Sequence, residues 1–347
     1  MREKSTKVLV IATSRKTRGG ITSVIKAHET GAQWKKFHCR WIETHVDKGV
    51  GKKLWRFIIS LMQFMVLIPF YNLAHIHLSK PPSTYRKYFF FRLAKLLHKK
   101  VVIHLHIGNQ IESVWNKMYE KFFVQADVVI VLSHVAEKMI KKLLNGKEAN
   151  IQVLYNPTVS IPSTGEVSQH PYILFAGTLD YNKGFRDLIR SFAKIASDHA
   201  TWKLVFAGNG EIDEGKHLAK ELGIEAQTLF LGWINGEVKD KVFKEASIFC
   251  LPSYAEGFPM AVLDAWTYGL PVITTPVGGL PDVLEDGKNA LVFHPGDMQH
   301  LSHQLERLIS DDELRKNISK ESLKLSQTVF AIENINQQLA DIYKELL

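Results

Sequence analysis

Residues 250–282 decide the fold of this chain and read CLPSYAEGFPMAVLDAWTYGLPVITTPVGGLPD. A strand-like run enters a loop, a helical run follows Pro259, and a second strand-like run covers 271–274. Proline suits the first helical turn because the N–H that it lacks has no intrahelical partner there. A helix N-terminus at the carboxyl edge of a parallel sheet favours anions. The stretch predicts a site for a phosphate-bearing ligand, in which the acids Glu256 and Asp264 hold hydroxyl groups.

Strand-like and helical runs also alternate on both sides of this stretch. Such alternation predicts an α/β protein with parallel, doubly wound sheets. Residues 157–171 contain three prolines and little periodicity, which is typical of a linker. The 347 residues are enough for two domains of ordinary size. We therefore expect two Rossmann-like halves joined near residues 157–171.

The net charge of +9 is unevenly distributed between these halves. Residues 1–165 carry 27 Lys and Arg against 9 Asp and Glu, a balance of +18, whereas residues 166–347 carry 17 against 26, a balance of −9. A basic half beside an acidic half implies that the basic half faces an anionic surface. Its basic residues are interleaved with long apolar runs and form no nucleic-acid motif. The expected partner is therefore an anionic membrane surface and not nucleic acid.

The cysteines and the N-terminus bear on the compartment. Cys39 and Cys250 lie far apart in apolar runs, and they form neither a disulfide framework nor a metal spacing. A reducing compartment is therefore expected. No apolar signal segment precedes the first strand-like run, so secretion is not expected.

Residues 51–71 form the most apolar segment of the basic half. Its apolar part, 57–70, falls short of the roughly 20 residues that a spanning helix needs, and it contains Gln63 and Pro69. The segment is therefore not expected to be transmembrane. Two interpretations stay open: a buried helix of an α/β domain, or a helix in the membrane interface with Trp55 and basic residues at its edge.

Three smaller features could carry chemistry. Gly19 and Gly20 open a helix after the first strand, where backbone N–H groups can approach a diphosphate, although a structural turn explains them equally well. Lys183 follows another strand and can offer a point charge to phosphate oxygens, although most lone lysines are simply solvated. His104 and His106 alternate along a strand and so share one face. They could be metal ligands, but no third ligand follows at a useful spacing.

The two histidines have different positions in that strand. His106 stands at the strand end, where it can hydrogen-bond a substrate. For His104 the default interpretation is a core histidine whose hydrogen bonds are satisfied.

Taken together, these stretches resemble the retaining glycosyltransferases of the GT-B fold, glycosyltransferase family four. The resemblance is strongest over about residues 172–297, and the N-terminal half matches only at Gly19-Gly20 and at His106 to Gly108. The ordered matches in the C-terminal half are Phe175 to Leu179, Lys183-Gly184, Ala207 to Gly210, Phe230 to Trp233, Glu256 to Met260, Tyr268 to Ile273, Gly278 to Asp282, and Asn289.

The resemblance implies the architecture and the activity. It implies two Rossmann-like domains facing across a cleft: an acceptor-binding domain over 1–165 and a donor-binding domain over 166–329, with a final helix of about 330–347 packing back on the first. The implied activity moves a sugar from a UDP- or GDP-sugar to a lipid-linked or cell-envelope glycan, as in polysaccharide, capsule or lipopolysaccharide biosynthesis. We expect a cytoplasmic enzyme, peripherally associated with the cytoplasmic membrane.

The resemblance also assigns roles to single residues. It places Glu256 against the donor sugar, Asp264 against the ribose hydroxyls, Lys183 on the diphosphate and His106 at the reaction centre. The expected catalytic residues are therefore His106, Glu256 and Lys183. The expected donor-binding residues are Gly19, Gly20, Thr178, Asn209, Gly257, Phe258, Pro259, Met260, Ala261 and Asp264.

Two positions depart from the family pattern. Asp264 stands where the family usually has Glu, and its side chain is one methylene shorter. Either the nucleotide therefore sits slightly differently, or a water molecule bridges the carboxylate and the ribose hydroxyls. Thr178 stands where the family has an Arg, so one positive charge is missing from the diphosphate clamp. Either Arg186 or a helix N-terminus compensates, or donor binding is weaker.

The expected chemistry needs no metal and no cofactor. No Asp-x-Asp motif is present. Lys183 and the N–H groups near Gly19-Gly20 and Met260 can stabilise the leaving diphosphate. Retention of the anomeric configuration of the transferred sugar is implied by the resemblance alone. No obvious nucleophile stands near His106, which favours front-face substitution, with the leaving phosphate helping to deprotonate the acceptor.

Two other functions stay open. A GT-B epimerase or hydrolase of nucleotide sugars would turn over donor without acceptor, and it would not need the basic, aromatic segments 51–71 and 85–100. A non-catalytic binding protein of a glycan-assembly complex would bind nucleotide sugar tightly without turnover. The departures at Asp264 and Thr178 leave room for it.

Overall fold

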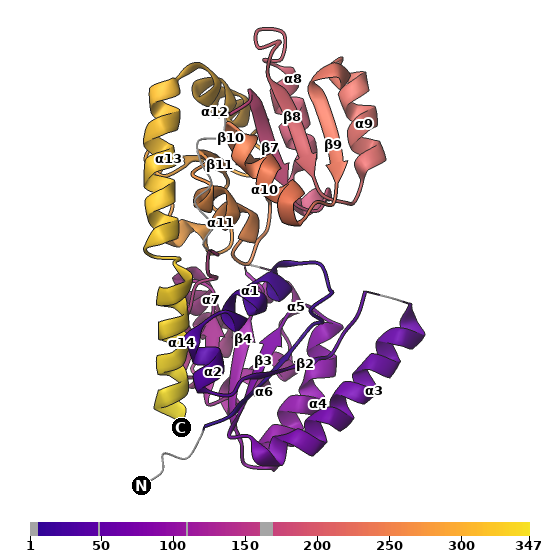
Figure 1. The fold of residues 1–347 in the computed structure, drawn as a ribbon, viewed down its shortest axis with the longest axis vertical. Helices are drawn as coiled ribbons and strands as arrows, with labels where there is room; N and C mark the ends of the chain where they lie inside the picture. Colours follow the sequence, from indigo (N-terminus) through magenta and orange to yellow (C-terminus); the bar gives the residue numbers. More distant parts are fainter. Residues whose placement is uncertain (1–5, 48, 109, 160–168) are drawn as a thin grey trace. The chain divides into compact units, whose positions relative to one another are not determined.

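The computed structural model describes residues 6–47, 49–108, 110–159 and 169–347. The chain divides into two compact units, the first formed by Met1–Pro157 with Ile332–Leu347 and the second by Thr158–Ala331 (Figure 1). The expected domain boundary was at 165 and the expected returning helix began at about 330, and the units divide at Pro157 and Ile332. Residues 160–168, the greater part of the expected linker, lie outside the described residues.

The first unit is built on a sheet whose strand pairings are all parallel. In spatial order its strands are β2 (Arg40–Glu43), β1 (Val8–Ala12), β3 (Leu73–Leu78), β4 (Lys100–Leu105), β5 (Val128–Val131) and β6 (Ile151–Val153). The chain goes from β1 to β2 on one side and then to β3 on the other, so the strand order reverses between β1 and β3. Ligands of open α/β sheets bind outside the carboxyl ends of the strands at such a switch point.

Helices cover both faces of this sheet because successive strand residues point to opposite faces. One face packs against α1 (Gly20–Glu29), α2 (Ala32–Lys36) and α14 (Ile332–Leu346), through residues such as Val10, Val102 and Tyr343. The other face packs against α3 (Val50–Leu67), α4 (Ser83–Leu96), α5 (Ile111–Val114), α6 (Lys117–Gln125) and α7 (His134–Leu144). The last helix therefore belongs to the core of the first unit.

The second unit has the strand order of a Rossmann fold. In space its strands run β12 (Leu291–Val292), β11 (Val272–Thr274), β10 (Ile248–Leu251), β7 (Tyr172–Ala176), β8 (Lys203–Ala207) and β9 (Thr228–Gly232), all parallel. Numbered within the unit this order is 6-5-4-1-2-3, and its switch point lies between β7 and β10. The expected pair of Rossmann-like domains is confirmed.

The helices of the second unit alternate with its strands, as the sequence predicts. They are α8 (Phe185–Ala193), α9 (Ile212–Glu221), α10 (Gly236–Glu245), α11 (Met260–Thr267), α12 (Met298–Ser310) and α13 (Asp312–Gln327). The decisive stretch supplies β10, a loop, α11 and β11. The predicted strand, loop, helix and strand are therefore present in that order.

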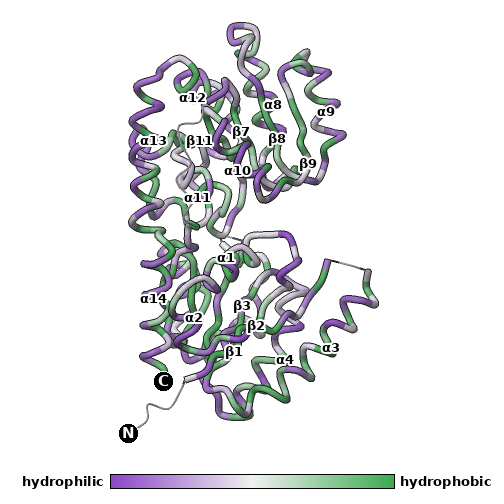
Figure 2. The backbone as a smooth tube through the Cα atoms, viewed as in Figure 1, coloured by the Kyte–Doolittle hydropathy of each residue, from purple (hydrophilic) through white to green (hydrophobic). Residues whose placement is uncertain are grey.

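Helix α3 is not the buried helix that one interpretation of residues 51–71 required. Only Ser60 and Phe64 of α3 are buried, although hydrophobic residues occur along its length (Figure 2). By length and composition Val50–Phe70 could also cross a membrane: its mean hydropathy is 1.4 and only 17% of it is buried. The sequence estimate counted 57–70 alone and so underestimated this length. Phe64 and Ile68 nevertheless lie in the core of the first unit, which ties one face of the helix to the protein.

Candidate active site

Lys183 and Glu256 meet at the switch point of the second unit. Lys183 ends a short 3-10 turn after β7, and Glu256 lies in the loop after β10. The Lys183 Nζ lies 2.6 Å from Glu256 Oε1, and Ser253 Oγ donates to the same oxygen over 2.7 Å. Both bonds use Oε1, so Oε2 is left for a ligand hydroxyl. The Glu256 side chain is 8% exposed, so the ion pair holds a carboxylate that is almost buried.

Two glycines hold this loop in place. Gly184 has φ 68°, and a Cβ there would lie 2.1 Å from the carbonyl oxygen of Pro252. Gly278 has φ 64°, and a Cβ there would lie 2.5 Å and 2.6 Å from the carbonyl oxygens of Gly257 and Glu256. Any other residue at either position would push the Glu256 loop away. These glycines of the sequence motifs therefore position the loop that carries the carboxylate.

The loop after β8 packs equally closely on the loop after β7. A Cβ on Gly208 would lie 1.7 Å from the carbonyl oxygen of Gly177, and the N–H of Leu179 donates to the backbone oxygen of Asn209 over 2.7 Å. Asn209 Oδ1 accepts from the backbone N–H of Trp233 over 3.1 Å. Through its backbone oxygen and its side-chain oxygen, Asn209 thus ties three loops together. Its Nδ2 makes no recorded bond within the described chain and can serve a sugar-nucleotide ligand. Thr178, between these loops, is exposed.

Arg186 does not supply the charge that is missing at Thr178. Its guanidinium lies 2.8 Å from Glu211 Oε2 and 2.5 Å from Glu214 Oε1. Hydrogen bonds and charge from these two acids raise the pKa of Arg186. Two acids therefore neutralise it, and of the two expected substitutes only a helix N-terminus remains.

Helix α11 provides that N-terminus. It begins at Met260, so the N–H groups of Met260 and Ala261 point out of its first turn without intrahelical partners. Pro259 precedes the helix in extended conformation. The Phe258 side chain is buried against Phe330, with ring centroids 5.3 Å apart. Only the backbone of Phe258 can therefore contact a sugar-nucleotide donor.

Asp264 on α11 has a partner that the sequence analysis missed. The Nζ of Lys239, from α10, lies 2.7 Å from Asp264 Oδ2. Burial raises the pKa of Asp264, and the charge of Lys239 opposes that shift. Nothing in the spacing of residues 239 and 264 could have revealed this pair, because it depends on how α10 packs beside α11. Together the pair offers a carboxylate and an ammonium to a nucleotide.

Gly19, Gly20 and His106 belong to the first unit, where they share the carboxyl edge of the sheet. Gly19 has φ 134°, which only glycine adopts readily, and α1 begins at Gly20. His106 follows β4, and its Nε2 lies 2.8 Å from His77 Nδ1. Burial, with the nearby charge of Lys87, lowers the pKa of His106 to about 3. The imidazole of His106 is therefore neutral and can exchange hydrogen bonds.

Three histidines of β3 and β4, His75, His77 and His104, form a stack behind His106, and two expectations about them were wrong. Nitrogens of His75, His77 and His104 lie within 4.8 Å of one another, so a third potential metal ligand does exist. Neither nitrogen of His104 has a hydrogen-bond partner among the described residues, so it is not a satisfied core histidine. The rings of His75 and His104 lie only 4° from parallel, which favours stacking over convergence on one ion. We assign no metal to them.

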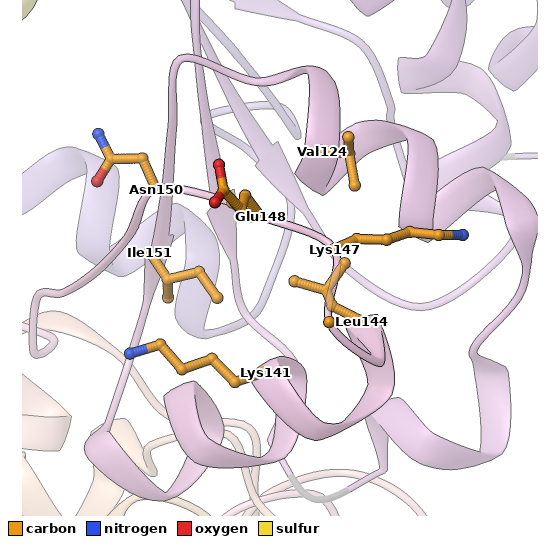
Figure 3. A pocket seen from close by; sticks show the side chains of 9 residues that line it. Val124, Lys141, Leu144, Lys147, Glu148, Asn150 and Ile151 are labelled. Carbon is orange, nitrogen blue, oxygen red and sulfur yellow. The ribbon is translucent and has the colours of Figure 1, made fainter.

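A surface depression of about 590 Å³ lies elsewhere in the first unit (Figure 3). It is lined by the ends of α6 and α7 and the start of β6, at the amino edge of the sheet. Lys141 and Lys147 at its rim pair with Glu137 and Glu120. It contains none of the expected site residues, and ligands of such sheets bind at the opposite edge.

The two Rossmann-like units define the GT-B class. The structure of HepE from Anabaena in complex with UDP-glucose matches with a TM-score of 0.78 and 18% identity, over 98% of this chain and 99% of that one. At this identity the likeness shows the fold, and it confirms the expected fold class.

Residues 156–325, which hold the Lys183–Glu256 pair, match the family described as glycosyl transferases group 1. An uncharacterized glycosyltransferase of Methanocaldococcus jannaschii is 29% identical over 62% of this chain. The lipopolysaccharide 1,6-galactosyltransferase of Salmonella typhimurium is 28% identical over 58% of it. These matches span 59% and 57% of the two relatives' own lengths. The expected resemblance to glycosyltransferases is confirmed.

Proposed function

We propose that the protein is a retaining glycosyltransferase that moves a sugar from a UDP- or GDP-sugar to a lipid-linked or cell-envelope glycan. The observation that carries this proposal is the 2.6 Å pair of Lys183 and Glu256 at the switch point of the family-matched unit. An ammonium beside the leaving diphosphate stabilises its developing charge, and the carboxylate accepts hydrogen bonds from sugar hydroxyls.

The chain's own residues supply the rest of the proposed reaction. Lys183 and the N–H groups of Met260 and Ala261 neutralise the diphosphate, so the proposed reaction requires no metal. The Asp264–Lys239 pair holds the ribose side of the nucleotide. His106 is neutral and hydrogen-bonds the transferred sugar. The leaving phosphate oxygen takes the proton of the acceptor hydroxyl on the same face as the new bond, which retains the configuration.

The names of the relatives support the substrate classes. HepE binds UDP and UDP-glucose, which supports a nucleotide-sugar donor. The Salmonella relative is a lipopolysaccharide 1,6-galactosyltransferase, which supports an envelope glycan as acceptor.

A panel of UDP- and GDP-sugars should identify the donor by thermal stabilisation. A ligand at 100 times its Kd adds about 2.7 kcal/mol of stability, so the matching sugar nucleotide should raise the melting temperature by roughly 5–10 °C. Transfer is then measured with that donor on lipid-linked and polysaccharide acceptors. If no sugar nucleotide stabilises the protein, the proposal is wrong. Turnover of donor at the same rate without acceptor would instead identify an epimerase or hydrolase. Binding of a sugar nucleotide with no turnover on any acceptor would identify a non-catalytic glycan-assembly protein.

We also propose that the first unit docks peripherally on the cytoplasmic face of an anionic membrane through α3 and α4. Apolar side chains on both helices face solvent, among them Trp55, Met62, Val66 and Phe89. An apolar helix face flanked by basic residues such as Lys52 lies in the interface of anionic bilayers. Spanning is less compatible with the structure, because it would remove the opposite face of α3 from the core.

Flotation with vesicles tests this surface. The wild type should float with phosphatidylglycerol vesicles at low salt and less at high salt, since the attraction is screened. Met62→Glu with Val66→Glu places two charges on the apolar face and should abolish flotation. Val238→Glu, an equally exposed valine on α10 of the other unit, is the matched control and should float like the wild type. Failure of the wild type to bind at low salt would refute the docking surface.

A further inference from the structure

A buried lysine occupies a core position of α4. The buried residues of this helix are Thr84, Lys87, Phe90, Phe91 and Ala94. Their spacing of three and four residues marks the stripe that faces the sheet. Lys87 is only 2% exposed. An apolar residue would be the ordinary occupant of such a position, because charged side chains are almost never fully buried without a partner.

No acid accompanies this lysine. Among the residues that the structure describes, no hydrogen bond or ion pair joins the ammonium of Lys87, and the like charge of Arg86 adds to burial in lowering its pKa. Arg86 has a buried Nε that also lacks a partner within the described chain. Two acids of the segment after β2 are engaged elsewhere: Glu43 pairs with Arg15 and Arg56, and Asp47 lies 3.5 Å from the ring of His45. Lys87 and Arg86 therefore have no counter-ion within the described part of the chain.

The two cations lie where an α/β sheet binds its ligand. Helix α4 starts after β3, and the switch point of this sheet falls between β1 and β3. The loop after β1 contributes two buried hydroxyl oxygens without partners in the described chain, Thr13 Oγ1 and Thr17 Oγ1, and His45 contributes an unpaired Nδ1. Unsatisfied buried polar atoms in a native protein call for an explanation, and a bound group is one. Of these groups, His45 lies near enough to Arg86 and Lys87 for their charges to lower its pKa.

We propose that Lys87 and Arg86, together with His45, form a subsite for a phosphate group of the acceptor. This proposal rests on the transferase function, because it adds the acceptor's phosphate to that reaction. Phosphate fits because its oxygens accept charge-assisted hydrogen bonds from several directions, and these donors come from α4 and from the segment after β2. Burial lowers the pKa of Lys87 to about 7, and a bound anion would restore its charge. His106, at the end of β4, lies near enough to feel the charge of Lys87, so the subsite adjoins the expected reaction centre.

Inorganic phosphate is the probe. Phosphate is titrated into the full chain at constant ionic strength, with chloride as the balancing anion, in the presence and absence of saturating UDP. It should raise the melting temperature of the wild type in both series. Lys87→Met removes the charge and shortens the unbranched side chain by one heavy atom, and it should weaken phosphate binding about 10- to 100-fold. Lys138→Met, at an exposed position of α7, should bind phosphate like the wild type.

Three outcomes would overturn the subsite. They are no stabilisation by phosphate, equal stabilisation of the wild type and Lys87→Met, and loss of the effect when UDP is bound, which would assign the phosphate to the donor site. The melting temperature without phosphate tests separately whether Lys87 has a purely structural role. Without phosphate, Lys87→Met should melt no lower than the wild type, since it removes a buried charge that has no counter-ion. The shift caused by UDP alone should be the same in both proteins, and its absence from both would refute the transferase function instead.

Discussion

Replacing Glu256 by Ala should lower sugar transfer about 100- to 1,000-fold while changing nucleotide affinity far less. The carboxylate is held by Lys183 and Ser253 through one oxygen. In the proposed reaction its second oxygen binds the donor sugar. Its loss frees the sugar and removes the partner that fixes the ammonium of Lys183 on the diphosphate. Losing one preorganised group at a reaction centre costs about 2.7–4 kcal/mol of transition-state stabilisation. Initial rates with saturating donor, beside UDP binding by calorimetry, measure the two effects.

Two further variants give this prediction its controls. Asp264→Ala should show the reverse pattern, with weaker nucleotide binding and a smaller loss of rate at saturating donor, because Asp264 and Lys239 hold the nucleotide. Glu285→Ala breaks another ion pair of the same unit, to Lys288 at 2.8 Å, in an exposed position, and it should leave both quantities unchanged. If Glu256→Ala and Asp264→Ala lose rate and affinity in equal proportion, the separate roles are wrong.

The sequence predicted best what local chemistry determines. Proline and glycine mark loops and helix starts, so the loop between β10 and α11 and its acid at Glu256 were predictable. Gly184 and Gly278 could be recognised as motif residues, but not as the steric supports of the Glu256 loop. That role depends on carbonyl oxygens from distant segments.

Contacts between distant segments were beyond local patterns. The pairing of Lys239 with Asp264 depends on helix packing, and so does the engagement of Arg186 by two acids. The exposure of α3 could not be inferred from the sequence, because an apolar helix has the same sequence pattern whether protein or lipid covers it. Lys87 looked like one more basic residue of a basic helix, and only its place on the buried stripe of α4 sets it apart.

The histidines of the first unit should make this unit sensitive to acid. Burial lowers the pKa values of His28, His75, His77, His104 and His106 below the ordinary value of 6.5. Below pH 6.5 the unfolded chain therefore binds protons that the folded unit excludes. The stability is fully present above pH 6.5 and falls as the pH drops through that value towards the folded pKa values. Each histidine contributes up to about 1.4 kcal/mol per pH unit.

Five such histidines together can remove several kcal/mol between pH 6.5 and 5.5, a large share of the 5–15 kcal/mol that is typical of folded domains. Urea unfolding at pH 7.5, 6.5 and 5.5, with EDTA present to exclude bound metal, measures the slope. His104→Val fits a β-strand and removes one titrating group, so its stability should fall less steeply with acid. His98→Asn is the matched control for loss of a histidine outside the stack, because its position is exposed and Asn tolerates the φ of 52° there. A wild-type stability that is flat over this range would show that the stacked histidines are protonated in the folded protein, in which case their neutral, stacked arrangement around His106 is wrong.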